Sequence, residues 1–151
     1  MRLSDYLAED RVVILEGRTK EEVLDELTDV MAAAVPGLEK DRLAEAVFRR
    51  EGLMSTGVGL GIAIPHVRLP EVDSAFVAFG LSRDAISDYE SMDEKPVQIV
   101  VLIVAPHGRH DLYIKLLSHV ISLLKDPMLR SRVESAKTAS EIFSVLTGDE
   151  D

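Results

Sequence analysis

The chain has 151 residues, and its 17 Lys and Arg residues against 27 Asp and Glu residues give a formal net charge of −10 at pH 7. This length predicts one domain over residues 1–151, and the negative charge argues against a nucleic-acid partner because it repels phosphate backbones. The absence of cysteine excludes disulfides and thiolate nucleophiles and favours a cytoplasmic protein, and no apolar run reaches the roughly 20 residues that span a bilayer, so we expect no membrane insertion.

The first predicted elements are a strand and two helices. The strand is Val12–Leu15, in which β-branched residues predominate. A helix follows, because Thr19–Glu22 has the spacing of a capping box and apolar residues recur after it at helical intervals. A second helix is predicted over 41–51, and Arg50 falls in line with its apolar stripe. A cation in that position requires an explanation.

The segment 55–66, with the sequence STGVGLGIAIPH, combines hydroxyl residues, glycines and an apolar run. Two hydroxyl residues precede three alternating glycines: Ser55, Thr56, Gly57, Gly59 and Gly61. Glycines allow positive φ values, which lets main-chain N–H groups turn toward a bound anion. The glycine spacing matches neither a dinucleotide-binding fingerprint nor a nucleotide phosphate loop. The alternative is that the glycines form tight turns, and residues 61–65 are a candidate strand.

His66 follows Pro65, which fixes its own φ and restricts the backbone before it. The ring is therefore held in one place. A neutral imidazole, with a reference pKa of about 6.5, can attack phosphorus and hold the phosphoryl group. Arg50, Thr56 and the loop amides are groups that would stabilise the charged oxygens in such a transfer. The alternative is a structural histidine at the end of a strand.

The second half of the chain supplies two strands and three helices. The strands are Ala75–Ser82 and Val97–Pro106, and the polar segment Arg83–Lys95 between them is predicted to be a surface loop. The helices are Leu112–Leu124, then Met128–Ala136 with Asp126-Pro127 as its cap and first turn, and a short one opened by a capping box at Thr138. Since the later strand is apolar almost throughout, it should be covered on both faces, which predicts an α/β sandwich with helices on both sides of the sheet.

The run RREGLMSTGVGLGIAIPHVRLP resembles the signature of the enzyme IIA domains of the phosphoenolpyruvate-dependent phosphotransferase system, in the fructose/mannitol and nitrogen-regulatory class (EIIA type 2). The likeness extends over nearly the whole chain, including the late strand and the terminal helices. It implies a single three-layer α/β sandwich with a mixed β-sheet flanked by helices on both faces. It also implies that His66 is the phosphorylated residue and that Arg50, sixteen positions earlier, assists the phosphoryl group.

One position departs from the family pattern. Where the family has a second active-site histidine, this chain has Tyr113, which lies on the apolar face of its predicted helix. We expect either that Tyr113 packs in the core, or that its hydroxyl, or His110 one turn earlier, donates the hydrogen bond that the family's histidine would supply. The four histidines lack the spacing of a metal site, so we expect no metal and no cofactor.

The resemblance implies a phosphotransferase component that carries a phosphoryl group on His66, received from a histidine phosphocarrier protein similar to HPr. The group then passes to an EIIB domain or acts as a regulatory switch for an ion transporter, a kinase or a transcription factor. EIIB domains are usually phosphorylated on cysteine, so this cysteine-free chain cannot perform that step itself. The alternative is a degenerate regulatory binding module that is not phosphorylated, and Tyr113 is the feature that favours it.

Overall fold

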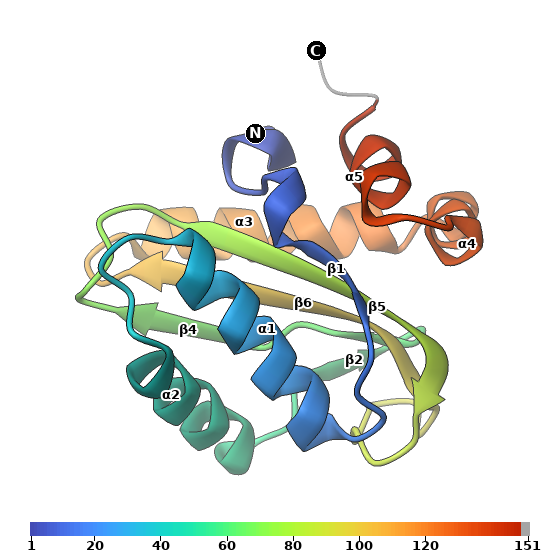
Figure 1. Cartoon of the computed structure of the whole chain (residues 1–151), viewed down its shortest axis with the longest axis horizontal. Helices are drawn as coiled ribbons and strands as arrows, with labels where there is room; N and C mark the ends of the chain where they lie inside the picture. The colour runs from blue at the N-terminus through green and yellow to red at the C-terminus, as the bar shows by residue number, and fades with distance from the viewer. Residues whose placement is uncertain (149–151) are drawn as a thin grey trace.

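The structure is a computed structural model that describes residues 1–148, so the last three residues of the predicted 1–151 domain lie outside the described residues. Figure 1 shows its five α-helices and its six-stranded sheet. The strands are β1 (Val12–Leu15), β2 (Gly57–Gly59), β3 (Ile62–Ala63), β4 (His66–Leu69), β5 (Phe76–Ile86) and β6 (Val97–Pro106). The helices are α1 (Lys20–Ala34), α2 (Lys40–Leu53), α3 (His110–Leu124), α4 (Pro127–Ser135) and α5 (Ala139–Thr147), preceded by two 3-10 turns, Leu3–Asp5 and Glu9–Arg11.

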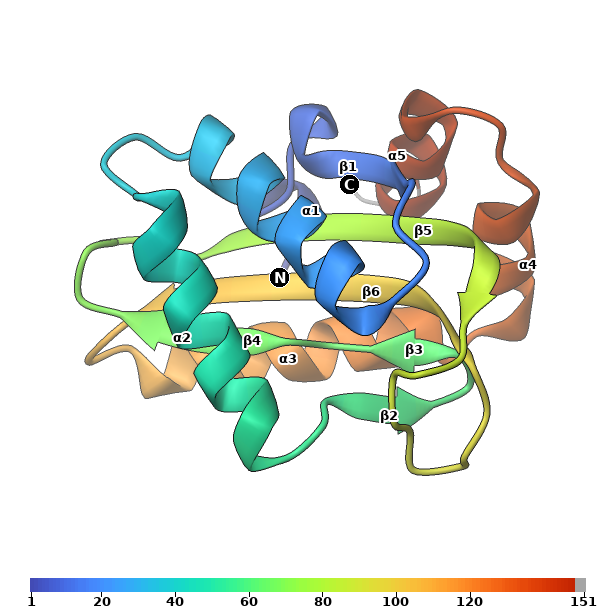
Figure 2. The same ribbon diagram turned by 60° about the horizontal axis from the view of Figure 1, so that its bottom comes forward.

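The sheet is mixed and is covered on both faces. Its strand order is β1-β5-β6-β3-β2, and β4 also pairs with β6. The β5 and β6 strands are antiparallel, whereas β1 pairs with β5, and β3 and β4 pair with β6, in parallel. The α1 and α2 helices lie on one face, and α3, α4 and α5 lie on the other (Figures 1 and 2). The predicted three-layer α/β sandwich is confirmed.

Each face of the sheet has its own hydrophobic core. The core under α1 and α2 contains Leu27, Met31 and Val47, and the core under α3 contains Leu116 and Val120. Burying a large apolar side chain of this kind contributes about 1.5 to 3 kcal/mol. Residues of β6 enter both cores, which explains why this strand is apolar almost throughout.

Side-chain caps begin three of the helices where the sequence predicts them. The capping residue is Thr19 in α1, Asp126 in α4 and Thr138 in α5, and each side chain accepts a hydrogen bond from an N–H two or three residues later. Each such cap contributes about 1 kcal/mol. The boundaries of these helices are therefore set locally.

Several boundaries differ from the prediction. The β2 and β4 strands escape prediction because β2 has three residues, two of them glycine, and β4 is a four-residue strand whose partner β6 lies about thirty residues later in the chain. The β5 strand continues through Ile86, so the predicted loop Arg83–Lys95 is wrong over its first residues, and Tyr89 within it is buried rather than exposed. Of the candidate strand 61–65, only β3 is strand, and α3 begins at His110, two residues earlier than predicted.

The β4 strand positions the candidate site. It pairs in parallel with β6, so that His66 lies opposite Ile103. Val67 and Leu69 enter the core under α1 and α2, so the alternation of side chains along a strand directs His66 and Arg68 to the α3 face. Within residues 1–148 no other strand pairs with β4, and α2 packs beside it (Figure 2).

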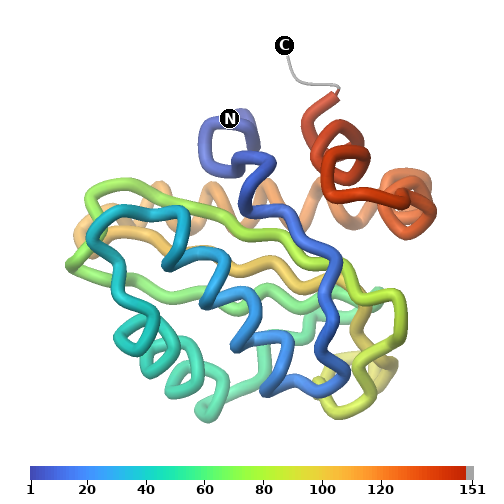
Figure 3. The backbone as a smooth tube through the Cα atoms, in the orientation of Figure 1, coloured from blue at the N-terminus to red at the C-terminus, as the bar shows by residue number. Residues whose placement is uncertain are grey.

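The two ends of the described chain lie on the α3 side of the sheet. The first 3-10 turn contacts both α3 and α5, as the backbone trace in Figure 3 shows. The N-terminal turns and α5 thus cover the part of the α3 face that β1 and β5 form. No helix within residues 1–148 has both the length and the apolar character needed to cross a membrane.

Candidate functional site

His66 is the first residue of β4 and is half-buried. Its Nδ1 atom lies 2.6 Å from the carbonyl oxygen of Ile64, with Pro65 between the two residues. Because a carbonyl oxygen only accepts hydrogen bonds, Nδ1 carries the proton and donates it. The Nε2 atom of the neutral ring is therefore unprotonated, and its lone pair is available.

The surroundings of His66 lower its pKa below the ordinary value of 6.5. Burial of the ring is the largest cause, because it disfavours the charged imidazolium, and the positive charge of Arg50 acts in the same direction. The hydrogen bond to Ile64 and the negative charge of Glu51 oppose this effect without reversing it. The ring is consequently neutral, and therefore nucleophilic, at neutral pH.

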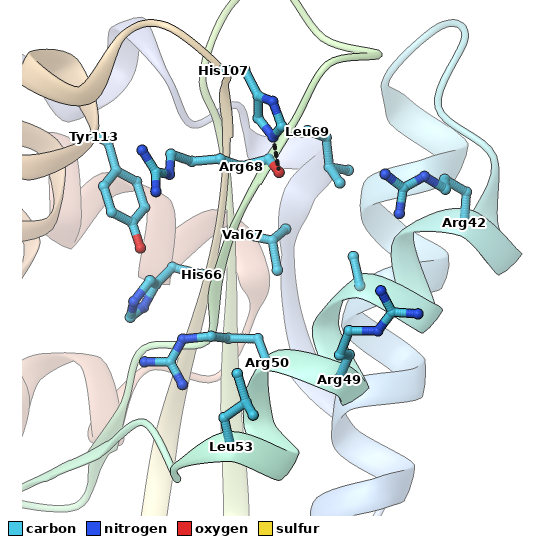
Figure 4. Close-up of a pocket in the computed structure, with 11 residues that line it drawn as sticks. Arg42, Arg49, Arg50, Leu53, His66, Val67, Arg68, Leu69, His107 and Tyr113 are labelled. Atoms are coloured by element: carbon cyan, nitrogen blue, oxygen red, sulfur yellow. Dashed lines mark hydrogen bonds between the residues drawn. The ribbon is translucent and has the colours of Figure 1, made fainter.

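Arg50 reaches the site from the last turn of α2. Its Nη1 atom donates a hydrogen bond to the carbonyl oxygen of Met54, 2.9 Å away, which orients the side chain. Figure 4 shows its guanidinium next to His66. Arg50 and His66, which the sequence analysis assigns to one site, therefore lie side by side in the structure. Arg50 lies beside the buried stripe of α2, however, and that stripe continues through Glu51.

An open cavity of about 390 Å³ lies against His66, and we call it the arginine cavity (Figure 4). His66 and Tyr113 form part of its wall together with four arginines: Arg42, Arg49, Arg50 and Arg68. For a chain of net charge −10, this is an unusual concentration of positive charge. Such a cavity favours an anionic ligand.

The four arginines differ in their partners. Arg42 and Arg49 are ion-paired, each with a glutamate, at N···O distances of 3.2 and 2.8 Å. Within residues 1–148, neither Arg50 nor Arg68 has a carboxylate partner. Arg68 follows His66 by two residues on β4, so the cations without a carboxylate partner flank the histidine. Sequence reasoning does not single out Arg68, because an exposed arginine on a short strand gives no local signal.

Tyr113 packs on His66 from α3. The centroids of the two rings are 5.3 Å apart and the ring planes are inclined by 57°, and the tyrosine hydroxyl points toward His66 (Figure 4). Burial raises the pKa of Tyr113, and Arg50 and Arg68 partly offset this effect. The hydroxyl is therefore protonated at neutral pH and can donate a hydrogen bond.

His110 lies further from the nucleophile. Its exposed ring is 6.2 Å from the ring of Tyr113, and its Nδ1 atom lies 3.5 Å from Nη1 of Arg68. His110 thus contacts Tyr113 and Arg68 rather than His66. In the described part of the chain, no group of three or more His, Cys, Asp or Glu residues could hold a metal ion.

A second open cavity, of about 450 Å³, also has His66 and Arg50 in its wall, and we call it the loop cavity. Ser55, Thr56 and Gly57 line it. Their polar groups, however, already have partners. The Ser55 hydroxyl donates to a main-chain carbonyl 2.6 Å away and accepts from the N–H of Gly57 at 3.3 Å, and Thr56 is buried. The hydroxyl groups of Ser55 and Thr56 therefore stabilise the loop through hydrogen bonds within the protein and are not free to donate to an anion.

Gly59 lies outside both cavities that His66 lines, and its φ of 98° lets the chain turn from β2 to β3. Asp93 closes this turn by accepting a hydrogen bond from the N–H of Leu60 at 3.0 Å. The structure therefore places Gly59 in the turn between β2 and β3, and its assignment to the phosphoryl-binding loop stays a prediction.

A buried polar cluster supports the loop from behind, and sequence reasoning does not predict it. The Glu51 carboxylate accepts hydrogen bonds from the N–H and the hydroxyl of Thr56 and forms an ion pair with Lys20 at 3.2 Å. The Tyr89 hydroxyl lies 2.9 Å from the Thr56 hydroxyl, and burial raises the pKa of Tyr89 strongly. One signal was present, since Glu51 follows Val47 at the interval of four that defines the buried stripe of α2.

The sequence matches the family described as "Phosphoenolpyruvate-dependent sugar phosphotransferase system, EIIA 2" over residues 5–148. A nitrogen regulatory protein from Bradyrhizobium diazoefficiens is 34% identical over 147 residues, which are 97% of this chain and 95% of that protein. A PTS system fructose-specific EIIABC component from Bacillus subtilis is 32% identical over 147 residues, 97% of this chain, and the chain spans 23% of its length.

The fold is shared with a solved structure. The crystal structure of nitrogen regulatory protein IIA-Ntr from Neisseria meningitidis superposes with a TM-score of 0.88 at 26% sequence identity. The superposition covers 96% of this chain and 99% of that one. The mixed sheet with helices on both faces is therefore the architecture of a known protein, and β4 and α2 belong to it.

Proposed function

The chain belongs to the EIIA type 2 family of the phosphoenolpyruvate-dependent sugar phosphotransferase system, and from this premise we propose that it is a cytoplasmic phosphoryl carrier phosphorylated on His66. One observation carries the proposal. The Nε2 lone pair of His66 is free because Nδ1 donates to Ile64, and it lies beside Arg50, which has no carboxylate partner in the described chain.

The proposed reaction begins with a phosphohistidine on an HPr-like phosphocarrier protein. The lone pair on Nε2 of His66 attacks the phosphorus atom and forms a new N–P bond. The N–P bond of the donor breaks, and its electron pair returns to the nitrogen of the donor's imidazole. The Nδ1 proton stays on His66, where Ile64 accepts its hydrogen bond and stabilises the positive charge that the ring gains. No proton transfer is required.

The phosphoryl group on His66 needs partners for its oxygens. In our proposal Arg50 is the main one, because its guanidinium lies beside the ring and forms part of both cavities. The hydroxyl of Tyr113 is directed to the same place and donates a second hydrogen bond. Ser55, Thr56 and Gly57 hold the shape of the loop cavity, since their own polar groups are already paired.

The rims of the two cavities provide a surface on which a phosphocarrier can dock. Three apolar side chains there are strongly exposed: Leu53 at 80%, Met54 at 72% and Met92 at 83%. Exposed apolar groups around a polar site are typical of surfaces that bind another protein. The net charge of −10 also favours a basic phosphocarrier.

A regulatory use of the phosphoryl group is a second candidate for the step after phosphorylation. The match to a nitrogen regulatory protein, which covers 95% of the length of that protein, favours this use. The match to an EIIABC component favours transfer to an EIIB domain instead. Phosphorylation would place about two negative charges at the edge of the sheet. That change would alter affinity for a partner such as an ion transporter or a kinase.

The first test is phosphorylation of the purified protein with phosphoenolpyruvate, enzyme I and a histidine phosphocarrier of either branch, followed by intact-mass analysis. We expect one acid-labile phosphoryl group on the wild type and none on His66→Ala. His119→Ala is the matched control, because His119 lies on α3 outside both cavities, and it should be phosphorylated like the wild type.

Two results would contradict the proposal. Label that persists in His66→Ala would place the phosphoryl group on another residue. A wild-type protein that accepts no label from either phosphocarrier would support the alternative, a regulatory binding module that is not phosphorylated.

A further inference from the structure

Arg68 is a second cation with free donors at the site. It follows His66 by two residues on β4, so the two side chains leave the same face of the strand about 6.6 Å apart. Arg68 is exposed, and no carboxylate within residues 1–148 pairs with it. Its polar contact is the 3.5 Å approach of Nη1 to His110. Most N–H groups of its guanidinium therefore remain available to a ligand.

An aromatic ring holds Arg68 in place. The guanidinium carbon lies 5.4 Å from the ring centroid of Tyr113, and the same ring packs on His66 at 5.3 Å. In Figure 4 the guanidinium of Arg68 lies beside the tyrosine ring and the hydroxyl end of the ring faces His66. A guanidinium held by an aromatic ring instead of a carboxylate keeps its full charge for an anion.

We infer that Arg68 is a second phosphoryl-binding cation of this site and that Tyr113 is the residue that positions it. The inference rests on the proposed phosphorylation of His66. A phosphohistidine carries close to two negative charges at neutral pH, whereas Arg50 supplies one positive charge and uses one of its N–H groups on Met54. Arg68 supplies the second charge from the arginine cavity, so that the two guanidinium groups approach the phosphoryl oxygens from different elements.

The main test compares Arg68→Ala with Arg42→Ala in the rate of phosphoryl transfer from the phosphorylated phosphocarrier. Arg42 is the matched control because it lies in the same cavity but is ion-paired with Glu71 at 3.2 Å. Loss of a charge-assisted hydrogen bond should slow Arg68→Ala by about tenfold to a hundredfold, and Arg68→Lys should fall between Arg68→Ala and the wild type. Arg42→Ala should change by less than about twofold.

A second readout separates charge from structure. A guanidinium next to the phosphoryl group favours its dianion, so Arg68→Ala should raise the pKa of the phosphoryl group in a phosphorus NMR titration, and Arg42→Ala should not. Equal rates and equal titrations in Arg68→Ala and Arg42→Ala would overturn the inference while leaving phosphorylation of His66 intact.

The positioning role of Tyr113 is tested by coupling. Tyr113→Phe keeps the ring and removes the hydroxyl, whereas Tyr113→Leu removes both. Tyr113→Leu should be slower than Tyr113→Phe, and this difference should become smaller in an Arg68→Ala background, because the ring then contacts His66 but has no guanidinium to hold. A difference of the same size in both backgrounds would contradict the positioning role.

An experiment with inorganic phosphate alone decides the role of Arg68 even if the wild type accepts no phosphoryl group. Phosphate at low ionic strength should shift the imidazole NMR signals of His66 in the wild type and in Arg42→Ala, with several-fold weaker binding to Arg68→Ala. Phosphate binding that is unchanged by Arg68→Ala, or absent from the wild type, would overturn the inference by a route independent of the phosphocarrier.

Discussion

The proton on Nδ1 of His66 is held by the carbonyl oxygen of Ile64, two residues earlier and across Pro65. The donor and the acceptor therefore belong to one short, stiff piece of backbone, and no distant side chain is needed to set the tautomer. Nε2 therefore keeps an available lone pair before any partner docks. Arg50, in contrast, comes from another element, so its contribution depends on the packing of α2 beside β4.

The lowered pKa of His66 predicts how phosphorylation depends on pH. The neutral ring is the nucleophile, and its pKa lies below 6.5 because burial and Arg50 disfavour the charged form. As the pH falls, the rate should therefore decrease with a midpoint that lies below 6.5. An NMR titration of the His66 ring should show the same midpoint.

Arg50→Gln provides the internal check on this pH dependence. Removing its positive charge should raise the pKa of His66, whereas Arg49→Gln, which removes an arginine ion-paired with Glu45, should leave it unchanged. A wild-type midpoint above 6.5 would contradict the proposed electrostatics of the site.

His66 could be singled out from the sequence as the proposed nucleophile because its signal is local. Pro65 and the glycine-rich run before His66 mark a constrained loop, and the spacing of α2 indicates Arg50. Arg68 and Tyr89 carry no such signal, since their roles arise from contacts with α3 and with α2. The spacing of the glycines does not distinguish Gly57, which lines the loop cavity, from Gly59, which lies in the turn between β2 and β3.

The C-terminal end of α2 carries two neighbouring side chains of opposite charge, Arg50 and Glu51, and they differ in how far they are buried. Arg50 points toward His66, and Glu51 points inward, where it is only 7% exposed. Glu51 connects α1 through Lys20, the loop through Thr56 and, by way of Thr56, the segment that contains Tyr89. This carboxylate therefore connects α1, the loop and the segment that contains Tyr89, and the last two of these also line the loop cavity or adjoin its wall.

Glu51→Ala should reduce the free energy of unfolding by about 2 to 4 kcal/mol, because it leaves the buried groups of Thr56 and the ammonium of Lys20 without their partner. Urea denaturation measures this change. Glu45→Ala is the matched control on the same helix, since its ion pair with Arg49 is exposed, and it should cost less than about 1 kcal/mol. Equal losses in the two variants would show that Glu51 has no special role.

The long elements were predictable because their patterns are periodic or continuously apolar. The apolar stripe and cap of α1, and the apolar run of β6, lead directly to the observed elements. The β2 and β4 strands could not be found in this way, because their residues become strand only by pairing with β3 and β6. The end of β5 is not recognisable as strand because Arg83 and Asp84 are polar, and the structure shows that this part of the strand is exposed.

At the scale of the whole molecule, an acidic chain places four arginines around one cavity beside His66. The chain has ten more acidic than basic residues, yet Arg50 and Arg68, the two arginines of the arginine cavity without carboxylate partners in the described chain, lie on either side of His66. The mixed sheet makes this possible, since β4 is an edge strand that both α2 and α3 can reach. The fold thus places the proposed phosphoryl-binding site in an open cavity, where a partner protein would have access to it.

The most direct test of the account is NMR of the imidazole nitrogens of the phosphorylated, isotope-labelled protein. We predict that phosphorus is bonded to Nε2 of His66 and that Nδ1 still carries its proton. Phosphorus on Nδ1, or an unmodified His66 in a protein phosphorylated elsewhere, would contradict the assignment of His66 Nε2 as the nucleophile.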